Sequence, residues 1–167
     1  MSIETLVISS TNTPTDAPTD TLIDTLATAR AQAASSGLSY AGGIHPQLAY
    51  ALASAGAAIL VDIRTTEERK FVGHVPGTLH VAWATGTAMT RNPRFVRELE
   101  AKTGKDATLL LLCRSGKRSV LAAEAAARAG FGNVFNVLEG FEGDLDDNRH
   151  RGHLGGWRSY HLPWVQD

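Results

Sequence analysis

Four segments of the chain repeat apolar side chains with the period of an α-helix. They are residues 20–36, 46–55, 91–102 and 119–129. The first is rich in alanine and places its larger apolar side chains on one face, and the second opens on Pro46, a favourable first-turn residue. We therefore predict a helix over each segment, with the first lying ahead of the rest of the fold as an N-terminal helical extension.

Between these helices the apolar residues form short continuous runs. The runs cover residues 57–63, 78–82, 108–112 and 133–137. Such short apolar runs are typical of strands that are buried in a parallel sheet. Strands that alternate with helices predict an α/β fold, in which a parallel β-sheet core is flanked by helices on both faces. The active site of such a fold lies beyond the carboxyl ends of the strands.

The length of the chain fits one domain. With 167 residues it can bury a single sizeable core. Residues 9–20 are polar and contain two prolines, which indicates a flexible segment. We therefore expect a flexible lead-in over residues 1–20 and a single domain over residues 21–167.

Composition and charge exclude several classes of function. A formal net charge of −1 gives no overall basic field, so neither nucleic acid nor an anionic membrane is an expected partner. No apolar run approaches the length of a membrane-spanning helix. The single cysteine excludes an intrachain disulfide and a cysteine-based metal cluster, and it fits a reducing compartment. Because the N-terminus shows no export signal, we expect a cytoplasmic protein.

The strongest chemical signal is the segment Cys113-Arg-Ser-Gly-Lys-Arg-Ser119, which joins a predicted strand to a predicted helix. A loop that enters a helix N-terminus directs backbone N–H groups inward, and the helix dipole adds positive potential there. Arg114, Lys117 and Arg118 add full charges, and Gly116 lets the loop curl around its contents. We call residues 113–119 the cationic cup. A cysteine at its base is expected to ionise to a thiolate.

A lone cysteine is more often an inert buried thiol than a functional group. Here the neighbours favour the opposite interpretation. Three cations, a glycine and a helix start would not help to bury an inert thiol, and charges packed against it would be costly. The surroundings of Cys113 therefore favour a functional cysteine.

The cationic cup resembles the active-site loop of the rhodaneses, the thiosulfate sulfurtransferase family. Two further stretches are similar to motifs of that family and occur in the family's order along the chain. They are Leu60-Val-Asp62-Ile-Arg64 with Glu67-Glu68 and Phe71-Val-Gly73-His74-Val-Pro76-Gly77 upstream, and Val137-Leu-Glu139-Gly140 with Gly156-Trp157 and Leu162-Pro163-Trp164 downstream. The resemblance covers roughly residues 44–165.

This resemblance implies a single-domain, rhodanese-type thiosulfate sulfurtransferase. Cys113 would be the catalytic residue and would carry a sulfane sulfur as a cysteine persulfide. The other cup residues would bind the substrate, namely Arg114, Ser115, Gly116, Lys117, Arg118 and Ser119. The donor would be thiosulfate or a similar small anion. The acceptor would be cyanide, a thiol or a protein, and it must come from outside because the chain has no second cysteine. No cofactor and no metal are expected.

Other residues of the upstream motif are expected to support the structure. The resemblance implies that Asp62 and Arg64 stabilise the fold. We expect His74 to shape the turn before Pro76 rather than to act as a base. Phe71 departs from the family pattern, since it stands three residues before His74 instead of four.

Residues 141–155 are a second departure, because they separate Gly140 from the Gly156-Trp157 pair that normally follows it directly. Their Asp-x-Asp-x-Asn start mimics a calcium loop. The glycine and glutamate that such a loop needs are replaced by Arg149 and Gly155, so we expect no metal. We expect instead a solvated loop near the pocket mouth, whose removal leaves a folded protein.

Two alternative functions stay open at this point. A regulatory module or non-enzymatic persulfide carrier can share the fold, although such modules often lose the cysteine that this chain keeps. The nearest rival enzyme is a phosphatase of the related dual-specificity type. Those phosphatases need a longer loop to hold a phosphoryl group, whereas Cys113 to Arg118 spans only six residues. The shorter loop favours sulfur over phosphate.

Overall fold

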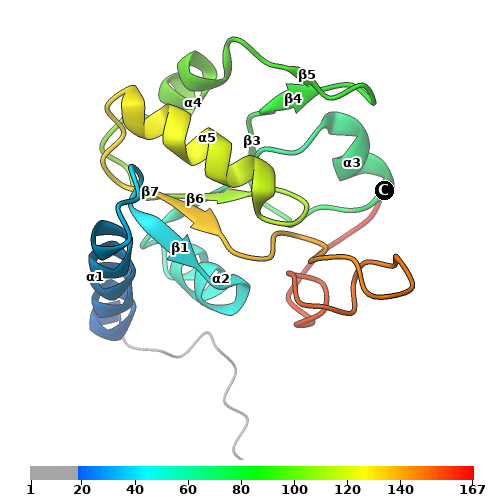
Figure 1. Cartoon of the computed structure of the whole chain (residues 1–167), viewed down its shortest axis with the longest axis horizontal. Helices are drawn as coiled ribbons and strands as arrows, with labels where there is room; N and C mark the ends of the chain where they lie inside the picture. Colours follow the sequence, from blue (N-terminus) through cyan, green and yellow to red (C-terminus); the bar gives the residue numbers. More distant parts are fainter. Residues whose placement is uncertain (1–18) are drawn as a thin grey trace, which may run out of the picture.

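The computed structural model describes residues 19–167. The predicted lead-in therefore lies outside the described residues, apart from its last two. Thr19 and Asp20 belong to the first helix, α1 (Thr19–Ser35), which begins slightly earlier than the sequence pattern predicts. The chain ends beside helix α3 (Thr66–Phe71; Figure 1).

Five parallel strands form the central sheet, in the order β1-β7-β6-β2-β3. These strands are β1 (Gly42–Ile44), β2 (Ile59–Asp62), β3 (Leu79–His80), β6 (Leu109–Leu112) and β7 (Val134–Val137). The helices after α1 are α2 (Pro46–Ser54), α3 (Thr66–Phe71), α4 (Phe95–Thr103) and α5 (Lys117–Arg128). A separate antiparallel hairpin pairs β4 (Ala84–Thr85) with β5 (Thr90–Arg91).

Helices cover both faces of the sheet, with α1 and α2 on one face and α4 and α5 on the other (Figure 1). Strand β6 shows why the sequence demands this arrangement. Leu110 and Leu112 pack with α1 and α2, while Leu109 and Leu111 pack with α4 and α5. All four leucines are fully buried, as a central parallel strand requires. The predicted α/β fold with an N-terminal helix is confirmed.

The sequence pattern does not reveal four short elements, and it places the start of α4 four residues too early. Strand β1 and the β4–β5 hairpin are too short, with three and two residues per strand, to show a period. Helix α3 was missed although Thr65 and Glu68 form a capping box at its start. Helix α4 begins at Phe95 rather than at residue 91, because Pro93 disfavours a helical backbone at Asn92.

The segment 141–155 begins with residues 141–143, which lie against the core and which we call the buried base, and continues as a projecting loop. Its first residue, Phe141, is fully buried in the core, which corrects the expectation that the whole segment is a solvated loop. The backbone N–H of Trp157 donates to the Gly140 carbonyl at 2.8 Å, so the two ends of the segment meet. A backbone bridge between Asp144 and Leu154 closes the projecting part, which is mostly exposed. The loop proper is therefore residues 144–154.

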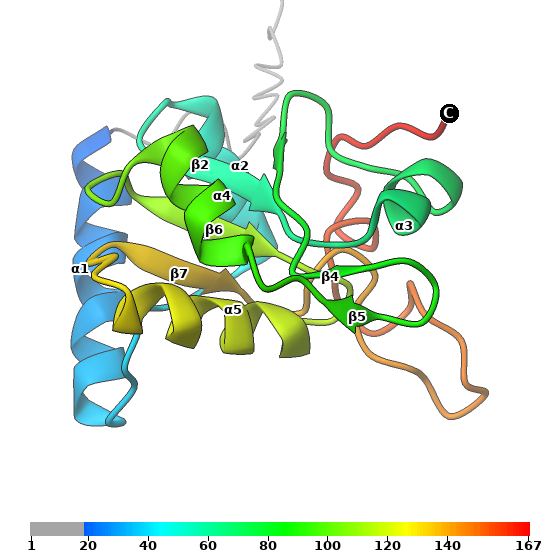
Figure 2. The same cartoon turned by 90° about the horizontal axis from the view of Figure 1, so that it is seen from above.

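The carboxyl ends of the strands face the segments that carry the sequence motifs. Helix α3, the β4–β5 hairpin, the start of α5 and the segment 141–155 all lie on this side of the sheet (Figures 1 and 2). Cys113 follows the last residue of β6 and so lies among them. None of the helices in residues 19–167 has the length and apolarity needed to cross a membrane.

Candidate active site

The cationic cup joins the end of β6 to the start of α5. Cys113 is only 1% exposed and lies at its base. The backbone N–H of Gly116 donates to Cys113 Sγ at 3.1 Å, and that of Ser119 donates at 3.4 Å. Gly116 has a φ of 91°, a conformation that favours glycine and turns its N–H toward the sulfur. The sulfur therefore sits where backbone donors and the N-terminus of α5 stabilise negative charge.

The outer wall of the cup is fixed by the backbone of the buried base. The N–H of Phe141 donates to the Cys113 carbonyl at 2.8 Å, and that of Glu142 donates to the Arg114 carbonyl at 2.9 Å. These bonds occupy both carbonyls from outside the cup. A side chain at Gly140 would bring a Cβ within 2.6 Å of the Arg114 carbonyl oxygen, so only glycine permits this close approach.

A buried polar pair extends the site behind the sulfur. Ser119 is fully buried, and its Oγ lies 3.1 Å from Cys113 Sγ. The same hydroxyl donates a hydrogen bond to the Oδ1 of Asn136 on β7. The sequence pattern predicts Ser119 as part of the cup but gives Asn136 no role. The available signal was a single polar residue in an otherwise apolar strand.

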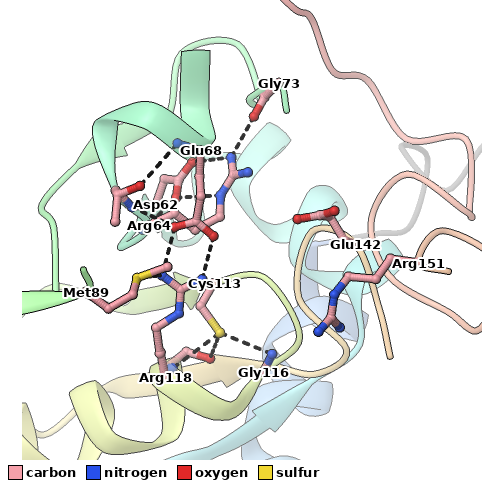
Figure 3. A network of polar contacts seen from close by, with 12 residues as sticks. Asp62, Arg64, Glu68, Gly73, Met89, Cys113, Gly116, Arg118, Glu142 and Arg151 are labelled. Atoms are coloured by element: carbon pink, nitrogen blue, oxygen red, sulfur yellow. Dashed lines mark hydrogen bonds and ion pairs between the residues drawn. The ribbon is translucent and has the colours of Figure 1, made fainter. Parts of the chain in front are cut away.

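Arg118 points toward α3 and forms a bidentate pair with Glu68. Its Nη1 and Nη2 donate to the two carboxylate oxygens at 2.8 and 2.6 Å (Figure 3). The Nη1 also lies 3.6 Å from the thioether sulfur of Met89, in the turn between β4 and β5. Both members of the ion pair are mostly buried, with side-chain exposures of 18% and 13%. The pair ties α5 to α3 across the cup.

The charge state of Glu68 follows from this pairing. Burial alone would raise the pKa of Glu68, but hydrogen bonds from Arg118 and the Thr65 N–H outweigh it and hold the pKa below its ordinary value. Burial alone would likewise lower the pKa of Arg118, but Glu68 raises it. The pair therefore stays ionised at neutral pH. Its stabilising contribution is present above the ordinary pKa of a glutamate and is lost as the pH falls through the lowered value.

The other predicted substrate-binding residues are placed differently. Arg114 and Ser115 are half-buried, and Lys117 is exposed at the first position of α5. The buried Nε of Arg114 has no hydrogen-bond partner within residues 19–167. Arg114 and Lys117 are therefore less committed to internal contacts than Arg118.

Asp62 and Arg64 form a buried support beneath the site. Two nitrogens of Arg64 donate to the Asp62 carboxylate at 3.0 and 2.7 Å, and neither side chain is exposed. Arg64 also donates to the Gly73 carbonyl at 2.8 Å, and its guanidinium lies 4.1 Å from the centroid of the Phe141 ring. The pair thus connects β2, the segment after α3 and the buried base. Breaking such a buried pair is strongly destabilising, which agrees with the predicted supporting role.

Comparisons with known proteins identify the family of this chain. The model of the rhodanese-like domain matches residues 45–146. The crystal structure of Rv0390 from M. tuberculosis is 42% identical in sequence, covers 77% of this chain and 99% of its own, and has a TM-score of 0.69. Rickettsia prowazekii protein RP600 is 36% identical over 111 residues, which are 64% of this chain and 82% of that protein. A chloroplastic protein of Arabidopsis thaliana, thiosulfate sulfurtransferase 16, is 31% identical over 83 residues, covering 48% and 68%. The chain belongs to the rhodanese-like domain family.

Proposed function

We propose that this protein is a sulfurtransferase that carries a sulfane sulfur on Cys113 as a persulfide. The observation that supports this most directly is the environment of Cys113 Sγ. Two backbone N–H groups donate to it at the N-terminus of α5, inside a loop that carries three cations. Such surroundings favour a nucleophilic thiolate and can then hold the anionic outer sulfur of a persulfide.

The proposed reaction has two steps. The Cys113 thiolate attacks the outer sulfur of thiosulfate, a new S–S bond forms, and the original S–S bond breaks. Sulfite leaves with the electron pair of that bond. An external acceptor then attacks the outer sulfur of the persulfide, and Cys113 leaves as a thiolate. With cyanide the product is thiocyanate. The chain has one cysteine, so no second thiol of its own can take the sulfur.

We propose that Arg114 and Lys117 make the main contacts with the anionic group of the donor. Both terminal nitrogens of Arg118 already bind Glu68, so its charge is largely balanced inside the protein. Within residues 19–167 the Nε of Arg114 has no hydrogen-bond partner, and Lys117 is exposed at the first position of α5. Arg118 would then position the loop and add positive potential rather than make the main contact with a sulfonate.

The proposed partners are a small anionic sulfur donor and an external thiol, cyanide or protein acceptor. We propose a cytoplasmic location, because a single unpaired cysteine fits a reducing compartment. Nucleic acid and membranes are not proposed as partners, since the net charge of −1 provides no basic field.

The test of this function is the intact mass of the protein. Thiosulfate is expected to add one sulfur atom, and cyanide is expected to remove it with formation of thiocyanate in equal amount. A protein whose mass does not change with thiosulfate, with an alkyl persulfide or with polysulfide would not be a sulfur carrier.

Substitutions of the cup cations are expected to separate donor binding from structural support. Arg114→Ala and Lys117→Ala should each lower kcat/KM for thiosulfate by about ten- to a hundredfold, since a charge-assisted hydrogen bond is worth about 1.5 to 3 kcal/mol. Their thermal stability should stay close to that of the parent. Steady-state kinetics with thiosulfate and with a less charged alkyl persulfide, together with thermal unfolding, check this.

Arg118→Ala is the matched comparison within the same loop. It leaves the mostly buried Glu68 without its partner, so the free energy of unfolding should fall by about 1 to 3 kcal/mol and both donors should be used less well. If Arg118→Ala kept its stability and lost turnover with thiosulfate alone, Arg118 would be the main anion contact, and our assignment to Arg114 and Lys117 would be wrong.

A further inference from the structure

Strand β7 carries one polar side chain where its neighbours are apolar. Asn136 is 3% exposed, and Phe135 and Val137 beside it are fully buried. A buried amide is costly unless it is hydrogen-bonded, and the Asn136 Oδ1 accepts a hydrogen bond from the Ser119 hydroxyl. Alanines on the inward face of α5 pack with β7 and allow this close contact. The partner of Ser119 is therefore built into the core of the fold.

The direction of this hydrogen bond limits what Ser119 can offer to Cys113. A serine hydroxyl has one proton and two lone pairs. With its proton directed to Asn136 Oδ1, Ser119 Oγ presents a lone pair toward Cys113 Sγ, which lies 3.1 Å away. A protonated thiol satisfies this contact by donating its S–H to Oγ. A thiolate would meet a lone pair there instead.

We propose that Asn136 is a positioning residue that holds the Ser119 hydroxyl as an acceptor toward Cys113 and so favours the protonated thiol before a donor binds. The backbone N–H groups of Gly116 and Ser119 act in the opposite sense, because they donate to Sγ. The balance between the Ser119 hydroxyl and these backbone donors sets the fraction of Cys113 that is present as the nucleophilic thiolate. The effect of Asn136 on catalysis rests on the proposed function, whereas the arrangement of hydrogen bonds around Ser119 does not.

Charged side chains around Cys113 also influence its ionisation. They include Asp62 at the end of β2 and Arg64 just after it, Glu68 on α3, Arg114 in the cup, Lys117 and Arg118 at the start of α5, Glu139 after β7, and Glu142 and Arg151 in the segment 141–155 (Figure 3). Replacing the neutral Asn136 by another neutral side chain changes none of these charges. Such a substitution therefore reports the orientation of the Ser119 hydroxyl.

The test measures the ionisation of Cys113 directly. Because the chain has one cysteine, selective carbon-13 labelling of cysteine gives one Cβ resonance, whose shift is followed with pH in the absence of any donor. In Asn136→Leu the Ser119 hydroxyl is free to donate to the sulfur, and the midpoint of this titration is expected to fall by about one pH unit. Asn136→Asp retains an oxygen toward Ser119, so its midpoint should stay at or above that of the parent.

Controls separate this effect from a general loosening of the core. Val134→Ala removes apolar contacts on the same face of β7 and should lower stability without moving the midpoint. In a Ser119→Ala background, Asn136→Leu should move the midpoint by less than about 0.3 units, since no hydroxyl is left to redirect. If Asn136→Leu does not fold, Asn136→Val offers a side chain well suited to a strand.

An unchanged midpoint in the apolar variants would overturn the proposal. A higher midpoint in these variants would indicate that the amide nitrogen of Asn136, rather than its oxygen, faces Ser119, and it would overturn the proposal as well. The titration needs no sulfur transfer, so a protein that takes no sulfur from any donor would refute the proposed function while leaving this result readable. Conversely, active variants with unmoved midpoints would refute only the role of Asn136.

Discussion

Replacing Cys113 by serine is expected to abolish both sulfur uptake and sulfur transfer. A serine hydroxyl stays protonated at neutral pH and is a far weaker nucleophile toward sulfur than a thiolate. The chain has no other cysteine that could substitute. Turnover should fall to the uncatalysed background, by at least about a thousandfold. Intact mass after incubation with thiosulfate, and thiocyanate formation with cyanide, measure the two losses.

The fold of this variant should persist, because serine has the shape of cysteine and is only slightly smaller, and the N–H groups of Gly116 and Ser119 can donate to oxygen as well as to sulfur. Circular dichroism and thermal unfolding therefore serve as controls for the activity loss. A gain of mass that persists in Cys113→Ser would place the sulfur on another residue, and the proposed mechanism would fail.

The strand, loop and helix around Cys113 could be predicted from the sequence because they are local in the chain. Residues 113–119 carry the cysteine, the glycine and the helix start together, so a strand, a tight loop and a helix fix their arrangement. The spacing of apolar residues likewise predicts the buried strands and the amphipathic helices. A strand buried on both faces shows a continuous apolar run, whereas a helix buried on one face shows apolar residues every three or four positions.

The parts that escaped prediction depend on contacts between distant residues. The sequence predicts Arg118 as a substrate-binding residue of the cup but gives no sign of its ion pair with Glu68, which lies 50 positions away on a helix too short to show a period. Asn136 lies 17 positions from Ser119, and only the packing of α5 on β7 brings them together. A charge or a polar residue in a sequence indicates that a partner is needed, but the fold decides which one.

Phe141 illustrates the same limit for an insertion. Comparison with the family pattern alone treats residues 141–155 as added material, since their removal restores the usual join. The fold divides this segment otherwise. Phe141 fills the core against Arg64, and the backbone of residues 141 and 142 holds the carbonyls of the cup. The added material that can be removed is thus shorter than the pattern suggests.

Two deletions of different length are expected to behave very differently. Joining Gly140 to Gly156 removes Phe141, whose loss alone should cost about 3 to 5 kcal/mol, together with two backbone hydrogen bonds to the cup. Against a typical total stability of about 5 to 15 kcal/mol, this deletion should unfold the protein or lower its melting temperature steeply. Joining Gly143 to Gly155 removes only the projecting loop 144–154. The backbones of these two glycines already touch, so this variant should stay folded.

Thermal unfolding of both deletions, with Phe141→Ala as the matched single substitution, measures the contribution of the buried base. The short deletion should also keep thiosulfate-to-cyanide turnover within about tenfold of the parent. The length of a surface loop changes the free energy of folding only slightly, and small anions can reach Cys113 without contacting this loop. Turnover with bulkier thiol or protein acceptors should change more strongly, since the loop contains Asp144, Asp146 and Asp147 and lies at the carboxyl end of the sheet (Figure 2). Equal stability of the two deletions would show that Phe141 and its backbone contacts are dispensable, and that the boundary drawn between buried base and loop is wrong.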